Sequence, residues 1–139
     1  MLLVIADDDR DSAETLAHLL RLLVAPPPDI LLASDGQEAL VAVLGSTPPP
    51  DAVIMDLEMP RMDGLNAAIG IRRALGSRAP MLIAVTGRVD LTRLARRSTA
   101  FDHALLKPVK VDDLLGLLSS TRHYRRWTAI AAPARGRPP

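Results

Sequence analysis

The chain has 139 residues, a length that suits one domain built around a single core. Hydrophobic residues make up 48% and aromatic residues only 2%, so the core is expected to be aliphatic. The formal net charge of +1 gives no general reason to expect binding to nucleic acids or membranes. Cysteine is absent, which excludes disulfides and thiolate chemistry and fits a reducing compartment. The apolar run at residues 2–6 is too short for a membrane span or a signal peptide, and we expect a cytoplasmic protein.

Short apolar segments alternate with longer amphipathic segments along the chain. This alternation predicts an α/β fold of repeated strand–helix units, with a doubly wound five-stranded parallel sheet and helices on both faces. The predicted strands are Leu2–Ala6, Ile30–Ser34, Ala52–Asp56, Met81–Val85 and His103–Leu106. The predicted helices are Arg10–Val24, the segment from the turn at residues 34–36 to Leu44, Gly64–Leu75, Leu91–Arg97 and Val111–Ser119.

Small and polar residues mark the ends of these helices. Asp11 or Ser12 is expected to cap the first helix, because short polar side chains accept hydrogen bonds from free amide groups there. Gly76 is expected to end the third helix. The turn before the third helix contains Gly64, which we expect to tolerate a positive φ.

Acidic residues follow the first predicted strand and end the third. Asp7 and Asp8 come directly after one, and Asp56 is the last residue of the other. Ligands in open α/β sheets bind beyond the carboxyl ends of the strands, so neighbouring strands would bring these carboxylates together. Carboxylates without histidine or cysteine suit a hard cation such as Mg²⁺, which often completes its shell with phosphate. Asp7 and Asp8 alone would fit equally well a solvated turn beside a helix cap.

Two further polar residues stand at the ends of later strands. Thr86 follows the fourth strand and Lys107 follows the fifth, one of only two lysines in the chain. A carboxylate that attacks phosphorus becomes an aspartyl phosphate, and a hydroxyl and an ammonium are suited to holding the transferred oxygens. The four strand ends therefore predict a phosphoryl-transfer site.

In this order, the motifs resemble the receiver domain of two-component response regulators. The residues that carry the resemblance are Asp7–Asp8, the segment Met55–Gly64 (MDLEMPRMDG), Thr86–Gly87 and Lys107–Pro108. The resemblance covers residues 1–121 and implies a flavodoxin-like fold with strand order 2-1-3-4-5. It also implies that the Lys107–Pro108 peptide bond is cis.

The resemblance implies a role for each residue of the site. Asp56 would be the phosphoacceptor, and Asp8 and Asp56 would be side-chain ligands of Mg²⁺ or Mn²⁺. Asp7 would contribute to the metal site through water, and Glu58 through its main-chain carbonyl. The residues that hold the phosphoryl group would be Thr86 and Lys107.

Two groups of residues near the site concern its regulation. The switch region would comprise Thr86, Gly87 and Ala104, but Ala104 stands where the family usually has an aromatic residue or histidine, which puts an aromatic switch in doubt. Glu58 and Arg88 flank the phosphoryl position in similar domains. We expect this acid and guanidinium to form a gate that modulates the lifetime of the aspartyl phosphate.

These roles predict a signalling protein that accepts a phosphoryl group from a histidine kinase or a histidine phosphotransfer protein. It would catalyse its own phosphorylation and slow dephosphorylation, and change what it binds. The face made by the fourth helix, fifth strand and fifth helix would contact a downstream protein or a second copy of the chain. A phosphorelay intermediate and a phosphate sink remain open.

Two other classes of protein are alternatives to this interpretation. A Mg²⁺-dependent aspartyl-phosphate phosphatase of the haloacid-dehalogenase type would need Thr or Val after its first-strand acids, and residues 7–11 lack both. A receiver-like domain used only for dimerisation is disfavoured by the intact Asp8, Asp56, Thr86 and Lys107.

The end of the chain has a different composition. From Arg122 onward there are five arginines and no acid, and we expect residues 122–139 to form a basic, partly disordered tail rich in proline, alanine and arginine. The alternative is a docking segment in which Tyr124 and Trp127 bind a partner protein or stack on nucleic acid. The tail is too short for a helix-turn-helix, so we do not expect this chain alone to bind DNA.

Overall fold

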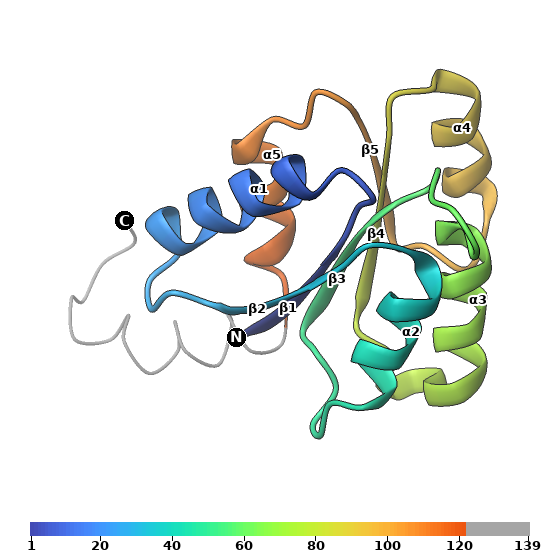
Figure 1. Cartoon of the computed structure of the whole chain (residues 1–139), viewed down its shortest axis with the longest axis horizontal. Helices are drawn as coiled ribbons and strands as arrows, with labels where there is room; N and C mark the ends of the chain where they lie inside the picture. Colours follow the sequence, from blue (N-terminus) through green and yellow to red (C-terminus); the bar gives the residue numbers. More distant parts are fainter. Residues whose placement is uncertain (122–139) are drawn as a thin grey trace.

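The computed structural model describes residues 1–121, which form a central parallel sheet between two layers of helices (Figure 1). The strands lie in the order β2-β1-β3-β4-β5, which confirms the predicted flavodoxin-like topology. The strands are β1 (Leu2–Ala6), β2 (Asp29–Ala33), β3 (Ala52–Asp56), β4 (Met81–Thr86) and β5 (His103–Leu106). The helices are α1 (Arg10–Leu23), α2 (Gly36–Leu44), α3 (Gly64–Leu75), α4 (Val89–Arg97) and α5 (Val111–Leu118), with a short 3₁₀ helix at Gly76–Arg78. The predictions for residues 122–139 lie outside the described residues.

The two faces of the sheet bury separate hydrophobic clusters. Alternate residues of each strand point to opposite faces, so Leu3 and Ile5 pack under α1 and α5, while Val4 and Ala6 face α2, α3 and α4. Every residue of β3 is buried, as expected for a central strand that is covered on both faces. Within residues 1–121, no helix has the length and apolar character needed to cross a membrane.

Several element ends differ from the sequence prediction. β2 begins one residue earlier and ends before Ser34, because Asp29 pairs with Leu2 and donates its amide to the Met1 carbonyl at 2.8 Å. α1 is capped by Asp9 and not by Asp11 or Ser12, since the Asp9 carboxylate accepts hydrogen bonds from the Ser12 amide and hydroxyl. α4 begins two residues earlier than predicted, at Val89.

The two glycines singled out in the sequence have different roles. Gly76 ends α3, as predicted, and has a positive φ of 55°. Gly64 has no positive φ, so that expectation was wrong. Its role is steric: a Cβ at position 64 would lie 2.3 Å from the backbone carbonyl oxygen of Asp56, so the start of α3 can approach the end of β3 only without a side chain.

Candidate functional site

Asp56 lies at the centre of the sheet, as the last residue of β3. Its side chain is 10% exposed, and each of its carboxylate oxygens has a partner. Oδ1 accepts a hydrogen bond from the backbone amide of Glu58 at 2.9 Å, and Oδ2 accepts one from Lys107 Nζ at 2.8 Å. The backbone amide fixes the orientation of the carboxylate, and the ammonium compensates its charge.

The acidic residues that follow β1 face Asp56. The parallel pairing of β1 with β3 places Ala6 opposite Met55, so both strands end at the same edge of the sheet. Carboxylate oxygens of Asp7, Asp8 and Asp56 lie within 4.8 Å of one another. Three oxygen donors at this spacing fit a hard divalent cation such as Mg²⁺ or Mn²⁺. Asp9 belongs to the cap of α1 and is not part of this group.

The electrostatics of the site are dominated by its acids. Burial raises the pKa of Asp7, and the nearby charge of Asp56 adds to this shift. Burial alone would lower the pKa of Lys107, but its hydrogen bond to Asp56 and the charges of Asp56 and Asp7 raise it. Lys107 Nζ lies 3.5 Å from Asp7 Oδ2. Three carboxylates thus face one ammonium, and a divalent cation would neutralise the excess negative charge.

Thr86 and Lys107 reach the same edge from β4 and β5. Thr86 is 1% exposed and ends β4, and its carbonyl accepts a hydrogen bond from the Lys107 amide at 2.8 Å. Its hydroxyl oxygen accepts one from the Arg88 amide at 3.2 Å. The following residue, Gly87, is exposed, and the Lys107–Pro108 peptide bond is cis, as the resemblance implied.

The two residues expected to form a gate, Glu58 and Arg88, are close to each other but not in tight contact. Arg88 Nη1 lies 3.9 Å from Glu58 Oε2, and both side chains are about half exposed. Arg88 makes a closer ion pair with Asp90, at 2.6 Å, which the sequence prediction missed. Hydrogen bonding to Asp90 raises the pKa of Arg88. The Glu58–Arg88 contact therefore competes with a shorter contact within the start of α4.

A second ion pair that the sequence prediction missed joins the loop after β3 to the start of α2. Arg61, in the loop between β3 and α3, forms an ion pair with Asp35, which is 1% exposed and caps α2. The two residues are 26 positions apart in the sequence, and no local sequence pattern predicts that they pair.

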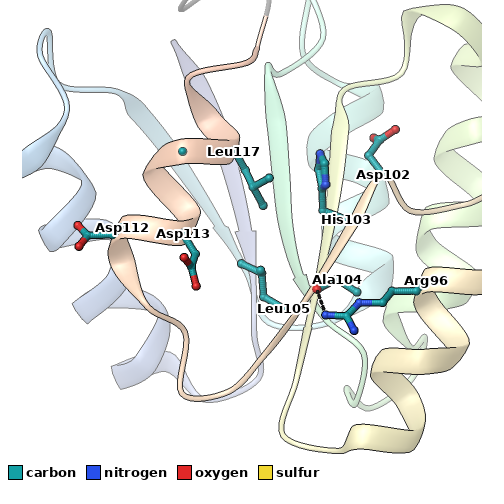
Figure 2. Close-up of a pocket in the computed structure, with 9 residues that line it drawn as sticks. Arg96, Asp102, His103, Ala104, Leu105, Asp112, Asp113 and Leu117 are labelled. Atoms are coloured by element: carbon teal, nitrogen blue, oxygen red, sulfur yellow. Dashed lines mark hydrogen bonds between the residues drawn. The ribbon is translucent and has the colours of Figure 1, made fainter. Parts of the chain in front are cut away.

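The face formed by α4, β5 and α5 contains a groove around Ala104 (Figure 2). Ala104 is buried, and Arg96 reaches from α4 to its carbonyl oxygen at 3.4 Å. The opposite side of the groove carries Asp112 and Asp113 at the start of α5. Asp102 and His103 line the groove as well, so the space beside Ala104 is bordered by both basic and acidic side chains.

Comparisons with known proteins agree with this architecture. The family model described as the response regulator receiver domain matches residues 3–119. Response regulator MprA of Mycolicibacterium vanbaalenii is 35% identical over 81% of this chain and 46% of its own length. The transcriptional regulatory protein PdtaR of Mycobacterium tuberculosis is 37% identical over 70% of this chain and 46% of its own length.

A solved structure shows the same arrangement of elements. Response regulator protein TrrA of Thermotoga maritima, in complex with Mg²⁺-BeF, superposes with a TM-score of 0.73 and 27% identity, covering 85% of this chain and 96% of that one. The chain spans about half the length of the curated relatives it matches. Since the family model covers most of its length, the chain belongs to the response regulator receiver domain family.

Proposed function

We propose that the chain accepts a phosphoryl group on Asp56 from the phosphohistidine of a sensor histidine kinase or a histidine phosphotransfer protein. An Asp56 carboxylate oxygen would attack phosphorus, forming a P–O bond as the P–N bond breaks, and the electron pair would leave with the imidazole nitrogen of the donor. The observation that carries the proposal is the meeting of Asp56, Asp7, Asp8 and Lys107 at one edge of the sheet.

Asp8 and Asp56 would hold the divalent cation through their side chains, with Asp7 acting through water and Glu58 through its main-chain carbonyl. When bound, Mg²⁺ or Mn²⁺ supplies positive charge that lets two anions approach each other. The three carboxylates that support this assignment lie at the ends of two adjacent strands, within 4.8 Å of one another.

Lys107 and Thr86 would stabilise the phosphoryl group on its other side. The Lys107 ammonium already contacts an Asp56 oxygen, and would contact a phosphoryl oxygen once that carboxylate oxygen is esterified. The Thr86 hydroxyl accepts from the Arg88 amide and retains its own proton to donate. An ammonium on the flexible lysine stem can follow the phosphoryl group as it forms.

Acetyl phosphate with Mg²⁺, followed by intact mass measurement, tests the proposal. Wild type should gain one phosphoryl group, and Asp56→Asn should gain none, because an amide is not a nucleophile toward phosphorus. A wild type that gains no adduct would refute the proposal and leave a scaffold. Continuous hydrolysis of the donor without an accumulated adduct would instead indicate a phosphatase. The lifetime of the adduct separates a switch from a phosphorelay intermediate or phosphate sink, which would pass the group on or lose it quickly.

The output would be a change in what the α4–β5–α5 face binds. This face combines Arg96 on α4 with Asp112 and Asp113 on α5 around a groove, which suits a downstream protein that carries both charges (Figure 2). The same arrangement would let two copies pair through this face, with α4 of one beside α5 of the other. A molecular mass in solution that remains that of a monomer after phosphorylation, measured by light scattering, would exclude the dimer.

A further inference from the structure

Arg61 adopts a backbone conformation that a side chain disfavours. Its φ is 63°, and within residues 1–121 it is the only residue other than glycine with a positive φ. A side chain in the left-handed region crowds the following carbonyl, so glycine or asparagine usually occupies such a position. An arginine at this position costs stability relative to glycine. Its side chain, however, makes a contact that glycine would lose.

The side chain of Arg61 binds a buried carboxylate. Its Nε donates to Asp35 Oδ2 at 2.5 Å, and its Nη2 contacts the same oxygen. The Asp35 side chain is 2% exposed, whereas that of Arg61 is 66% exposed. The other Asp35 oxygen accepts from the Glu38 amide at 2.8 Å, as the cap of α2. The hydrogen bond from the Glu38 amide has the larger effect and the Arg61 guanidinium the smaller one, and together they hold the pKa of Asp35 below its usual value. Without Arg61, a buried anionic oxygen would lose its cation.

The loop that contains Arg61 contacts the rest of the fold through apolar side chains, Met59 and Met62 among them, and through backbone hydrogen bonds. The Gly36 amide donates to the Met62 carbonyl at 2.8 Å, next to the Arg61–Asp35 pair. A Cβ on Gly36 would lie 2.4 Å from that carbonyl oxygen, so the start of α2 and the loop are in close contact. The Gly64 amide donates to the Leu57 carbonyl at 3.3 Å, which closes the loop at its base. Glu58, whose carbonyl is a proposed metal ligand, follows Leu57, and its amide donates to Asp56 Oδ1 at 2.9 Å. The amide is therefore held from the Asp56 side, and the part of the loop that follows it is held by the contacts of Arg61 and Met62 with the start of α2.

We propose that Arg61 is a positioning residue for the phosphoacceptor site: by pairing with buried Asp35 it holds the β3–α3 loop so that the Glu58 carbonyl faces the carboxylates of Asp7, Asp8 and Asp56. The inference rests on the proposed function, because the direction of the Glu58 carbonyl matters only if a cation binds there. Arg61 itself is not a ligand. It acts through the loop, in the way that groups outside the coordination shell orient metal ligands.

Titration of the full chain with Mg²⁺ alone, followed by calorimetry, tests this role without phosphorylation. Arg61→Gly removes the ion pair, which lowers stability, but suits the left-handed backbone, which raises it, so the variant should remain folded with the circular dichroism spectrum of wild type. The dissociation constant for Mg²⁺ should rise about tenfold. Arg61→Lys, which keeps the charge but loses the planar fork, should recover part of the affinity. Arg78→Gly makes the same change at the opposite edge of the sheet, before β4, and should leave Mg²⁺ affinity unchanged.

Asp35→Ser provides an independent test from the other side of the pair. Serine keeps an oxygen for the Glu38 amide but removes the charge that Arg61 binds. It should weaken Mg²⁺ binding as Arg61→Gly does, and the double variant should be no weaker than either single variant. Unchanged Mg²⁺ affinity in both single variants, additive losses in the double variant, or an equal loss in Arg78→Gly would overturn the inference. A wild type that forms no adduct with acetyl phosphate would instead defeat the proposed function.

Discussion

Replacing Gly64 by alanine would place a methyl group against the backbone of the proposed phosphoacceptor. The added Cβ would lie 2.3 Å from the Asp56 carbonyl oxygen and 3.0 Å from Met55 Cγ. Ordinary contact begins at 3.4 Å, so the start of α3 and the end of β3 must separate by about 1 Å. The Met55 side chain can move, but the Asp56 carbonyl belongs to the central strand of the sheet.

The expected cost follows from two opposing effects. Forcing an extra carbon into a packed interior costs about 1–3 kcal/mol, and here backbone has to move. Alanine within a helix is more favourable than glycine by about 0.5–1 kcal/mol, which offsets part of this loss of stability. We therefore expect Gly64→Ala to lower the free energy of unfolding by about 2 kcal/mol. Because Asp56 would move with its own carbonyl, the rate of phosphorylation should fall by about a hundredfold, the usual effect of a 1 Å misplacement of a reacting group.

Urea denaturation and the rate of adduct formation with acetyl phosphate measure these two effects. Gly116→Ala is the matched control, because a Cβ at position 116 in α5 meets no atom within 4 Å. That variant should be more stable than wild type by about 0.5–1 kcal/mol and should be phosphorylated at the wild-type rate. A Gly64→Ala protein as stable and as reactive as wild type would show that α3 is not held against Asp56 as described.

Two further predictions concern charged groups around the site. The Glu38 amide and the Arg61 guanidinium lower the pKa of Asp35, so its stabilising effect is present above its unfolded-state pKa of about 3.9 and is lost as the pH falls through the lower folded-state value. The stability difference between wild type and Asp35→Asn should therefore be constant above about pH 5 and shrink below about pH 4, and a difference that persists undiminished to about pH 2 would contradict this. Glu58→Ala and Arg88→Ala should each accelerate dephosphorylation about two- to fivefold, since the opposed side chains restrict the approach of water. Asp90→Ala, which releases Arg88 from its shorter ion pair, should slow dephosphorylation, and unchanged rates in all three variants would exclude a gate.

The strand ends were the most predictable part of the molecule. β3 is apolar until Asp56 and buried on both faces, so its length and its polar end are both visible in the sequence. The position of Lys107 directly after β5 was equally visible. The start of α4 was harder to predict, because its cap position is occupied by Arg88, whose side chain accepts no hydrogen bond from a backbone amide of the helix.

The interactions between distant loops were not predictable. The pair formed by Asp35 and Arg61 depends on the left-handed backbone of Arg61, and arginine gives no local indication of that conformation. The sequence shows that residue 64 is a glycine, but it does not show which neighbouring atom would clash with a side chain there. The prediction for Gly64 therefore named a positive φ, whereas the structure shows a steric requirement. Both features arise where two strand–helix connections meet, and local patterns do not describe such contacts.

The coupling that we propose between the site and the α4–β5–α5 face would have to work without a change of side-chain rotamer at position 104. Alanine has no χ1 angle, and Ala104 is buried opposite Ala84 in the sheet. The Thr86 side chain is instead connected to α4, because its hydroxyl oxygen accepts a hydrogen bond from the Arg88 amide, one residue before the helix. A Thr86 hydroxyl that turned toward a phosphoryl group would give up this bond and release the start of α4, where no side-chain cap compensates for it. In this chain the signal would therefore enter the output face through the first turn of α4, and not through a side chain of β5.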